Sequence, residues 1–370
     1  MNLTHLILSN FKNYRDADLT FSEKINCLVG GNGEGKTNVL DAIYYLSFCK
    51  SYFNPVDSQN ILHKADFFAV HGTYTQPELN EDKVSCIQKR NHKKQFKLNK
   101  KDYDRLADHI GKIPLVMISP YDRDLINEGS DTRRKYIDGV ISQFDPVYLN
   151  DLLEYNKALQ QRNILLKSFT ERGSFDPLSL SAWDEMLIRH GQPLYEKRAE
   201  FLDQFNPLFN QFYGFLSREK EQVSIEYSSQ MEQVGLQELL KQSLQKDRTA
   251  RYTTVGTHKD DLIFLIDGYP VKKFGSQGQQ KTFVVAIKLA QFEYTRLKKG
   301  FKPILLFDDI FDKLDDSRVA QIVELVSQEN FGQVFITDTQ LQRIRSIFEA
   351  AKIDHKIFTV KQGTATQLDD

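Results

Sequence analysis

The chain has 370 residues, 40% of them hydrophobic, and a formal net charge of −1 at pH 7. This length allows a large core in one domain or two lobes, and the near-neutral charge excludes a polycation, so any surface for nucleic acid must be local. Three cysteines without a C-x-x-C pair, no apolar run near the ~18 residues of a membrane span and no signal-peptide core indicate a cytoplasmic protein without a zinc site or membrane segment.

The first predicted elements are strands that lead into a glycine-rich loop and a helix. Leu3 to Leu8 alternates as a strand, a turn follows, and Leu19 to Phe21 leads to a short buried strand at 25–29. The next residues match G-x-x-x-x-G-K-[ST] in full, from Gly30 to Thr37. Glycines let the backbone N–H groups surround a phosphate, and the following helix adds its positive N-terminus. A chance glycine turn is the alternative, but it does not account for the complete octet.

This loop predicts a site for ATP and Mg²⁺. Lys36 can reach the β- and γ-phosphates, where it is also expected to be catalytic, and the Thr37 hydroxyl can bind Mg²⁺. The predicted nucleotide contacts of the loop are Gly30, Gly31, Asn32, Gly33, Glu34, Gly35, Lys36, Thr37 and Asn38.

A basic segment lies among the next predicted strands, which are at 71–75, 83–89, 95–98 and 115–118. Lys89–Lys101 (KRNHKKQFKLNKK) has seven Lys or Arg residues and no acid. Such a run is typical of a solvated hairpin face. The alternative is a surface that follows the phosphates of DNA.

Helices are predicted from about 120 to 221. Leu149, Leu152, Leu159 and Leu166 share one helical face. The aromatic segment Phe201–Leu216 follows, with a break expected at Pro207. No heptad persists over three or four repeats, so we expect a helical insertion and not a coiled-coil arm.

The C-terminal part returns to alternating strands and helices. Strand cores are predicted at 223–227, 262–266, 304–307 and 334–336, and helices at 277–298, 316–328 and 340–350. This alternation predicts an α/β sheet that closes on the strand before the glycine loop.

Two further segments can complete a nucleotide site. The apolar strand ILLFDD ends in Asp308 and Asp309, and a cation would compensate the cost of acids at the end of a buried strand. Asp308 is placed to bind Mg²⁺, and Asp309 to orient or deprotonate a water; a strand end that meets solvent is the alternative. In GSQGQQKT, Ser276 caps a helix between two glycines, which makes either a second anion-binding helix start or an ordinary structural cap.

The order of these motifs resembles the head of an ABC-type ATPase, and their details are similar to the RecF family of the SMC-like branch. Ser119–Asp138 (SPYDRDLINEGSDTRRKYID) resembles the first signature of that family, and 306–318 (LFDDIFDKLDDSR) resembles its second. Phe311–Asp315 looks like the D-loop, although Asp312 stands where Ser is usual. The resemblance runs from about Leu3 to Val360.

The resemblance implies an α/β fold, an ABC-type P-loop ATPase head with an inserted helical lobe. The ATPase lobe would comprise 1–119 and 222–370, and the helical lobe 120–221. Two heads of this family enclose two ATP molecules, so Ser276, Gly278 and Gln279 of one chain are expected to contact the nucleotide held by the other. Transporter-type ATPases have a switch histidine at the end of the matching strand. Asp338 stands near that place here and is the candidate catalytic residue there. Asp309 is shorter than the transporters' Glu, so hydrolysis is expected to be weak.

The resemblance also implies a function in DNA repair, replication and SOS induction. RecF-like proteins dimerise on ATP, bind single-stranded DNA and gapped duplex, and with RecR and RecO help to load RecA; they are not nucleases or helicases. The rivals are the ATPase subunit of a membrane transporter, which has about half the interval from P-loop to signature, and an SMC-type clamp, which needs long coiled-coil heptads. The expected DNA contacts are Lys93, Lys94, Lys97, Lys100, Lys101, Arg133 and Arg134.

Overall fold

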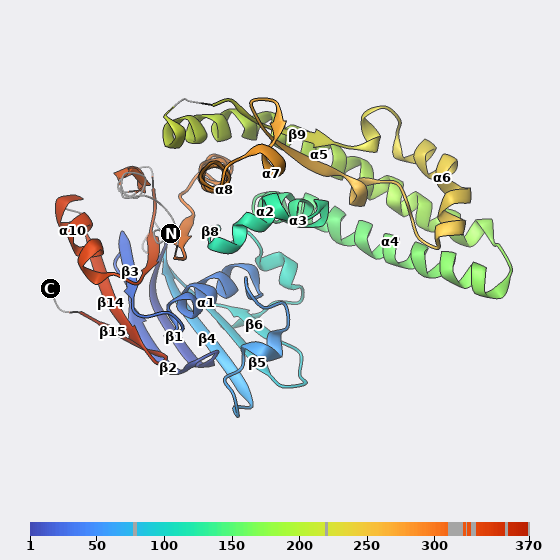
Figure 1. Ribbon diagram of the computed structural model, residues 1–370. Helices are drawn as coiled ribbons and strands as arrows, with labels where there is room; N and C mark the ends of the chain where they lie inside the picture. The colour runs from blue at the N-terminus through green and yellow to red at the C-terminus, as the bar shows by residue number, and fades with distance from the viewer. Residues whose placement is uncertain are drawn as a thin grey trace. The chain divides into compact units, whose positions relative to one another are not determined.

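The computed structural model describes residues 1–76, 80–218, 221–309, 321–322, 324–326, 331–351 and 354–368. The chain divides into two compact units, of which the first is Met1–Asp122 with Gln291–Asp370 and the second is Arg123–Ala290 (Figure 1). The first boundary lies close to the expected one at 119/120. The second unit extends to Ala290, well beyond the expected boundary at 221/222.

The first unit contains a six-stranded sheet in the order β15-β14-β3-β13-β12-β8. Its strands are β3 (Ile25–Val29), β8 (Leu115–Ile118), β12 (Ile304–Phe307), β13 (Val334–Asp338), β14 (His355–Lys361) and β15 (Thr364–Gln367). All pairs are parallel except β14 with β15. Every residue of β3, β8, β12 and β13 is buried, as in a parallel sheet with both faces covered. Their carboxyl ends share one edge, which is where polar residues can gather.

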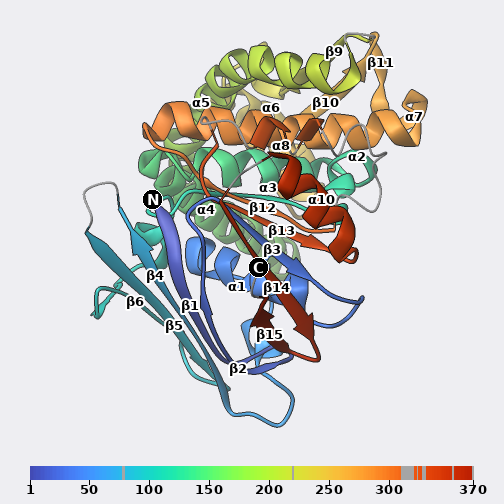
Figure 2. The same cartoon turned by 90° about the vertical axis from the view of Figure 1, so that its left-hand side faces the viewer.

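A second, antiparallel sheet of the same unit has the order β2-β1-β4-β5-β6-β7, and Figure 2 shows its strands β1, β2, β4, β5 and β6. Its strands are β1 (Asn2–Phe11), β2 (Tyr14–Thr20), β4 (Phe67–Thr75), β5 (Glu81–Lys89), β6 (Gln95–Leu98) and β7 (Lys101–Asp102). Helix α1 (Lys36–Phe48) contacts strands of both sheets. Leu6 of one sheet, Leu40 of the helix and Phe335 of the other sheet belong to one buried cluster, so a single core fixes the helix that follows the glycine loop.

The second unit is mainly helical. Its elements are α2 (Asp124–Asn127), α3 (Ser130–Ile141), α4 (Pro146–Arg172), α5 (Pro177–Ser217), β9 (Val223–Ser228), α6 (Leu236–Ala250), β10 (Asp261–Ile266), β11 (Tyr269–Pro270), α7 (Val271–Phe274) and most of α8 (Gln277–Lys299). Helices α4 and α5 lie side by side (Figure 1). Each begins with proline after an aspartate that caps its N-terminus, and α4 ends at Gly173 in a left-handed conformation.

Two expectations for this region are wrong. Helix α5 continues through Pro207, because the buried rings of Phe201, Phe205, Phe209 and Tyr213 hold the segment against its neighbours and outweigh the ~3 kcal/mol that an interior proline costs. The strands expected at 223–227 and 262–266 do form, but they pair with each other in the separate sheet β11-β10-β9 and not with the glycine-loop sheet. Strand β9 contacts α5, which is why this sheet belongs to the second unit.

Buried arginines hold the second unit together. Arg198 pairs with Asp138 at 2.9 Å and with Asp260 at 3.1 Å, and Arg162 pairs with Asp184 and Asp247, both at 2.6 Å. These ion pairs join α3, α4, α5, α6 and the segment before β10. Removing one partner of such a pair leaves a buried charge without compensation, so these residues are structural.

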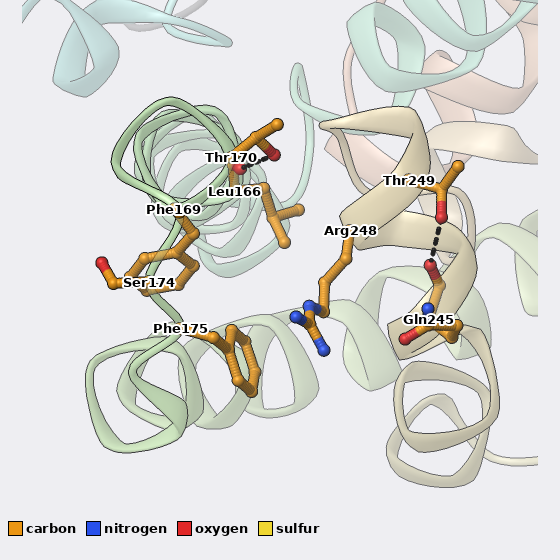
Figure 3. Close-up of a pocket in the computed structure, with 9 residues that line it drawn as sticks. Leu166, Phe169, Thr170, Ser174, Phe175, Gln245, Arg248 and Thr249 are labelled. Carbon is orange, nitrogen blue, oxygen red and sulfur yellow. Dashed lines mark hydrogen bonds between the residues drawn. The ribbon is translucent and has the colours of Figure 1, made fainter.

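A cavity of about 370 Å³ lies where the turn between α4 and α5 meets α6 (Figure 3). The guanidinium of Arg248 lies 4.3 Å from the centre of the Phe175 ring. Thr170 and Thr249 donate their hydroxyls to carbonyls of their own helices. The C-termini of α4 and α6 lie here, and the charge of Arg248 compensates the negative end of the α6 helix dipole, so the position of this cation has a structural explanation.

No helix among the described residues is long and apolar enough to cross a membrane.

Candidate nucleotide site

The glycine loop lies between β3 and α1 in a conformation that its glycines require. Gly35 has φ of 119°, and α1 begins at the next residue. A Cβ on Gly30 would lie 2.2 Å from the carbonyl oxygen of Val360, so β14 approaches too closely for any side chain. The Gly30 N–H donates to the Asp338 carbonyl at 3.2 Å. The loop therefore starts at the edge where the parallel strands end.

Two turns from other parts of the chain brace the loop. The Glu34 carbonyl accepts a hydrogen bond from Asn13 Nδ2 at 2.9 Å and another from the Gly363 N–H at 3.0 Å. The Asn13 side chain also accepts from Asn38 Nδ2 at 2.7 Å, and the Glu34 carboxylate accepts from the Gln362 N–H. The β1–β2 turn and the β14–β15 turn thus hold the tip of the loop in place.

Lys36 folds over the loop that it terminates. Its Nζ donates to the carbonyls of Gly30 and Gly31, both at 2.9 Å. The ammonium is held at the mouth of the loop, where its charge and the positive N-terminus of α1 favour an anion together.

Asp308 lies opposite the start of α1. Its Oδ1 accepts from Thr37 Oγ1 at 2.7 Å and from Thr337 Oγ1 at 3.0 Å. Burial raises the pKa of Asp308 to about 6, the hydrogen bond from Thr37 lowers it and the neighbouring charge of Asp309 raises it. A buried carboxylate that costs free energy to ionise is stabilised by a cation.

At Asp309, next to Asp308, the backbone turns away from the direction of strand β12. Its φ of 45° lies in the left-handed region, and its N–H donates to Thr337 Oγ1 at 2.8 Å. The same hydroxyl lies 3.3 Å from Asp309 Oδ1. Consecutive residues of a strand point to opposite faces; this turn instead leaves both carboxylates within reach of one threonine hydroxyl.

The carboxylate of Asp338 is engaged within the fold. Its Oδ1 accepts from the Gln340 N–H at 2.7 Å, and its Oδ2 pairs with Arg343 of α10 (Leu341–Ala351) at 2.6 Å. The residue lies at the expected edge through its backbone contact with Gly30, while its side chain orients the segment that starts α10. Its expected catalytic role stays a prediction.

The donor set fits Mg²⁺. Mg²⁺ prefers hard oxygen ligands and commonly uses one or two carboxylates together with substrate phosphates. The Thr37 hydroxyl and the Asp308 carboxylate are already 2.7 Å apart, and the burial of Asp308 favours a compensating cation. These two residues would hold the ion beside the phosphate loop.

Ser276 caps the N-terminus of α8 in the second unit. Its hydroxyl accepts from the Gln279 N–H at 3.2 Å, and the Gln279 side chain accepts from the Ser276 N–H at 2.6 Å. This is a reciprocal capping box. Gln279 also donates to Glu221 at 2.7 Å. Ser276 is exposed and Gly278 half-buried, so the helix start is open to a ligand from outside the chain.

The basic residues expected to contact DNA fall into two groups. Lys93, Lys100 and Lys101 are exposed on the β5–β6–β7 hairpins, and Lys97 pairs with Asp102 at 3.2 Å. Lys94 is different, because its side chain is only 11% exposed and its Nζ binds Asp57 and the Cys49 carbonyl. It also lies over the ring of Tyr45. Its main role here is structural.

Arg133 and Arg134 also have partners within the second unit. Arg133 makes a two-pronged ion pair with Asp261, at 2.7 and 2.9 Å. Arg134 donates to the Asp260 carbonyl at 2.7 Å. These two arginines join α3 to β10, and this explains their place in the motif without invoking DNA.

Sequence reasoning missed several residues of the site. Asn13, Thr337 and Gly363 contact the loop or the paired acids from distant parts of the chain, and no local motif marks them. Asn13 stands in a turn after the first strand, which is the only signal it offers. The predicted D-loop, Phe311–Asp315, lies outside the described residues, as does most of the helix expected at 316–328.

The chain matches known proteins over nearly its full length. The model of the RecF/RecN/SMC N terminal domain family matches residues 2–366. The DNA replication and repair protein RecF of Phocaeicola vulgatus is 49% identical over 368 residues, covering 99% of this chain and 98% of the relative. RecF of Flavobacterium johnsoniae is 51% identical over 360 residues, covering 97% of this chain and all of the relative.

Solved structures agree with these matches. A structure of the recombination mediator protein RecF of the RecFOR pathway with ATP is 31% identical, with a TM-score of 0.90, and covers 100% of this chain and 98% of that one. Its counterpart with ATPrS gives the same identity and TM-score. The Smc head domain of Pyrococcus yayanosii is 15% identical with a TM-score of 0.59, which shows a shared fold alone.

Proposed function

The chain belongs to the RecF family within the RecF/RecN/SMC group, and we propose that it is an ATP-dependent recombination mediator of DNA repair and replication. One observation carries the proposal: a complete phosphate loop is joined to a buried aspartate through the Thr37–Asp308 hydrogen bond, at the edge where the parallel strands end. The match to RecF structures with ATP over the whole chain supports the same reading of the site.

ATP acts as the closing signal between two copies of the chain. Lys36 and the loop N–H groups bind the phosphates on one copy, and Ser276 with the start of α8 contacts the γ-phosphate from the other. About 240 residues separate Lys36 from Ser276, and two-fold symmetry completes two sites at once. Without the γ-phosphate two polar surfaces meet without their charge-assisted hydrogen bonds, so the dimer is unfavourable.

Hydrolysis opens the dimer and is slow. Asp309 orients or deprotonates the attacking water, and Thr337 holds the backbone of Asp309 in the conformation that presents its carboxylate. When bound, Mg²⁺ would neutralise developing phosphate charge. Thr37 and Asp308 would hold it.

The closed dimer binds single-stranded DNA and gapped duplex, and with RecR and RecO it helps to load RecA, supporting gap repair, replication restart and SOS induction. The exposed hairpin lysines Lys93, Lys100 and Lys101 supply phosphate contacts. A transporter subunit is disfavoured by the long interval between Lys36 and Ser276. A structural SMC-type clamp is disfavoured because α4 and α5 have only 27 and 41 residues, too few for a long coiled coil.

Light scattering with and without ATP tests the switch. We expect the wild type to be monomeric without nucleotide and dimeric with ATP, and Ser276→Arg to bind ATP but remain monomeric. Mixing Ser276→Arg with Lys36→Ala chains sharpens the test, because each heterodimer contains one site with both substitutions and one with neither. Partial recovery of ATPase activity would support shared sites. A wild type equally dimeric without nucleotide would contradict the mechanism.

DNA binding is tested by its salt dependence on gapped duplex. If Z phosphates are neutralised, log K falls with log salt at a slope of about −0.9Z, and loss of one lysine contact reduces the slope by about 1. Lys100→Gln and Lys101→Gln should reduce the slope, while Lys246→Gln in α6 serves as an exposed control. Unchanged slopes in both hairpin variants would place the DNA surface elsewhere.

A further inference from the structure

Four residues of the segment 269–274, shortly before Ser276, form an exposed patch of two rings and two lysines. Tyr269 is 60% exposed and Phe274 is 63% exposed, and their ring centres lie 5.3 Å apart. Lys272 and Lys273 between them are both exposed. Within the described part of the chain neither lysine pairs with an acid. We call Tyr269, Lys272, Lys273 and Phe274 the aromatic–lysine patch.

The patch is fixed to the start of α8. The Gly275 N–H donates to the Val271 carbonyl at 2.9 Å, and Gln280 Nε2 donates to the Gly275 carbonyl at 3.1 Å. Val271 itself is fully buried. A Cβ on Gly275 would lie 2.8 Å from the Val271 carbonyl oxygen, so the chain folds back too tightly for another residue. The rings and lysines are therefore presented by a rigid support and not by a loose loop.

The patch must meet whatever meets Ser276. Two residues span at most about 7 Å of backbone, so Phe274 lies beside the serine, and its ring contact brings Tyr269 there as well. Single exposed aromatic residues are common and need no explanation. Two that touch, beside two exposed lysines that pair with no acid among the described residues and next to an exposed helix start, indicate a surface that becomes covered.

From this continuity we propose that the aromatic–lysine patch binds the nucleotide-loaded face of a second copy of this chain. This inference rests on the proposed ATP-dependent dimer and identifies the part of the second unit that stabilises it. The chemistry matches, because a loop that holds a nucleoside triphosphate presents a polyanion and a planar base. The two lysines are attracted to the triphosphate, and the exposed rings pack on the base or on the rim of the loop.

The lysines and the rings have separable contributions. Lysine charges act before contact and are screened by salt, so their loss should weaken dimerisation most at low ionic strength. The rings act through buried apolar area, so their loss should weaken dimerisation at all salt concentrations. Neither group touches the nucleotide held by its own chain in this proposal, so ATP binding to the monomer should be unchanged.

Sedimentation with ATP and increasing protein concentration tests the proposal. We expect Lys272→Glu/Lys273→Glu and Tyr269→Ser/Phe274→Ser each to weaken ATP-dependent dimerisation at least about tenfold, or about 1.4 kcal/mol. Lys241→Glu/Lys246→Glu in α6 and Leu178→Ser are matched controls, because they remove exposed lysines and an exposed apolar side chain elsewhere in the same unit. Fluorescent ATP titration should give wild-type affinity for all four variants.

The outcomes distinguish this proposal from the one on which it rests. If the wild type fails to dimerise with ATP, the proposed function is wrong. If the wild type dimerises and Ser276→Arg does not, while both patch variants dimerise like the controls, the patch proposal alone is overturned. Unchanged dimerisation with weakened binding to single-stranded DNA would assign the patch to DNA, since basic residues with exposed rings also suit single strands.

Discussion

Thr337 offers the sharpest test of how the paired acids are held. Its side chain is buried, and its hydroxyl accepts from the Asp309 N–H at 2.8 Å while donating to Asp308 Oδ1 at 3.0 Å. Thr337→Val keeps the shape and removes the hydroxyl. Asp309 then loses the hydrogen bond from its N–H, and Thr37 is the side-chain donor to Asp308 that remains among the described residues. The left-handed backbone at Asp309 also loses the bond that supports it.

The magnitude follows from these two hydrogen bonds. An N–H left without a partner costs about 1–3 kcal/mol, and a hydrogen bond to a charged group contributes about 1.5–3 kcal/mol. Because the two bonds share one hydroxyl they are not additive, so we expect a loss of about 3 kcal/mol in the free energy of unfolding of the first unit. ATP turnover should fall by at least about tenfold, because the orientation of Asp309 is lost.

Circular dichroism during urea unfolding measures the first effect. The single tryptophan, Trp183, lies in the second unit, so its fluorescence reports the unfolding of a part of the chain that the substitution does not touch. Thr337→Ser keeps the hydroxyl and should restore turnover to near the wild-type value. A Thr337→Val chain with wild-type turnover, or a serine variant as impaired as the valine variant, would refute the positioning role.

Three further predictions concern Lys36 of the phosphate loop, the neighbouring aspartates Asp308 and Asp309, and the stability of the fold at low pH. Lys36→Ala should lose ATP affinity in a titration while circular dichroism shows an intact fold, because the ammonium donates to carbonyls of the phosphate loop itself, at Gly30 and Gly31. Asp308→Asn should weaken Mg²⁺-dependent ATP binding, whereas Asp309→Asn should keep binding, slow turnover and prolong the dimer; equal loss of binding in both would refute separate roles. Burial lowers the pKa of His258 to about 4, below its ordinary 6.5. Between these two values the unfolded state binds a proton that the folded state does not. The free energy of unfolding therefore decreases as the pH is lowered, by about 2 kcal/mol at pH 5 relative to pH 7.5. His258→Gln should reduce this acid sensitivity in melting curves, and an unchanged pH dependence would argue against it.

The geometry of the candidate nucleotide site was predictable where local sequence dictates the backbone. The spacing of Gly30, Gly35 and Lys36 requires a tight loop before a helix, and an apolar strand ending in acids requires a sheet edge. Parallel strands bring such edges together, so the meeting of Thr37 with Asp308 follows from the topology. The signal is strong because each residue type has a chemical reason to stand at its position.

Local sequence does not show the distant partners that some residues have. Lys94 and Arg133 stand in basic runs, and nothing in those runs shows that Asp57 and Asp261 neutralise them. Pro207 has a local tendency to end a helix, yet the aromatic packing of α5 overrides it. Composition alone identifies a charged residue or a helix-breaking residue. The role of that residue depends on the side chains that contact it in the folded chain.

The proposed cycle has two separate events, which are ATP binding to one copy and closure of the dimer. The hydrogen bonds that hold the phosphate loop bear on the first of them. Asn13 and Gly363 hold the Glu34 carbonyl, and the carbonyls of Gly30 and Gly31 hold Lys36. The ordering of the loop is therefore complete in the folded chain, and ATP binding to one copy need not supply it. A ligand shifts an equilibrium only through its different affinity for the two states. In the proposed cycle, the free energy that drives closure therefore comes from contacts that exist only in the dimer, which we propose at Ser276 and the aromatic–lysine patch.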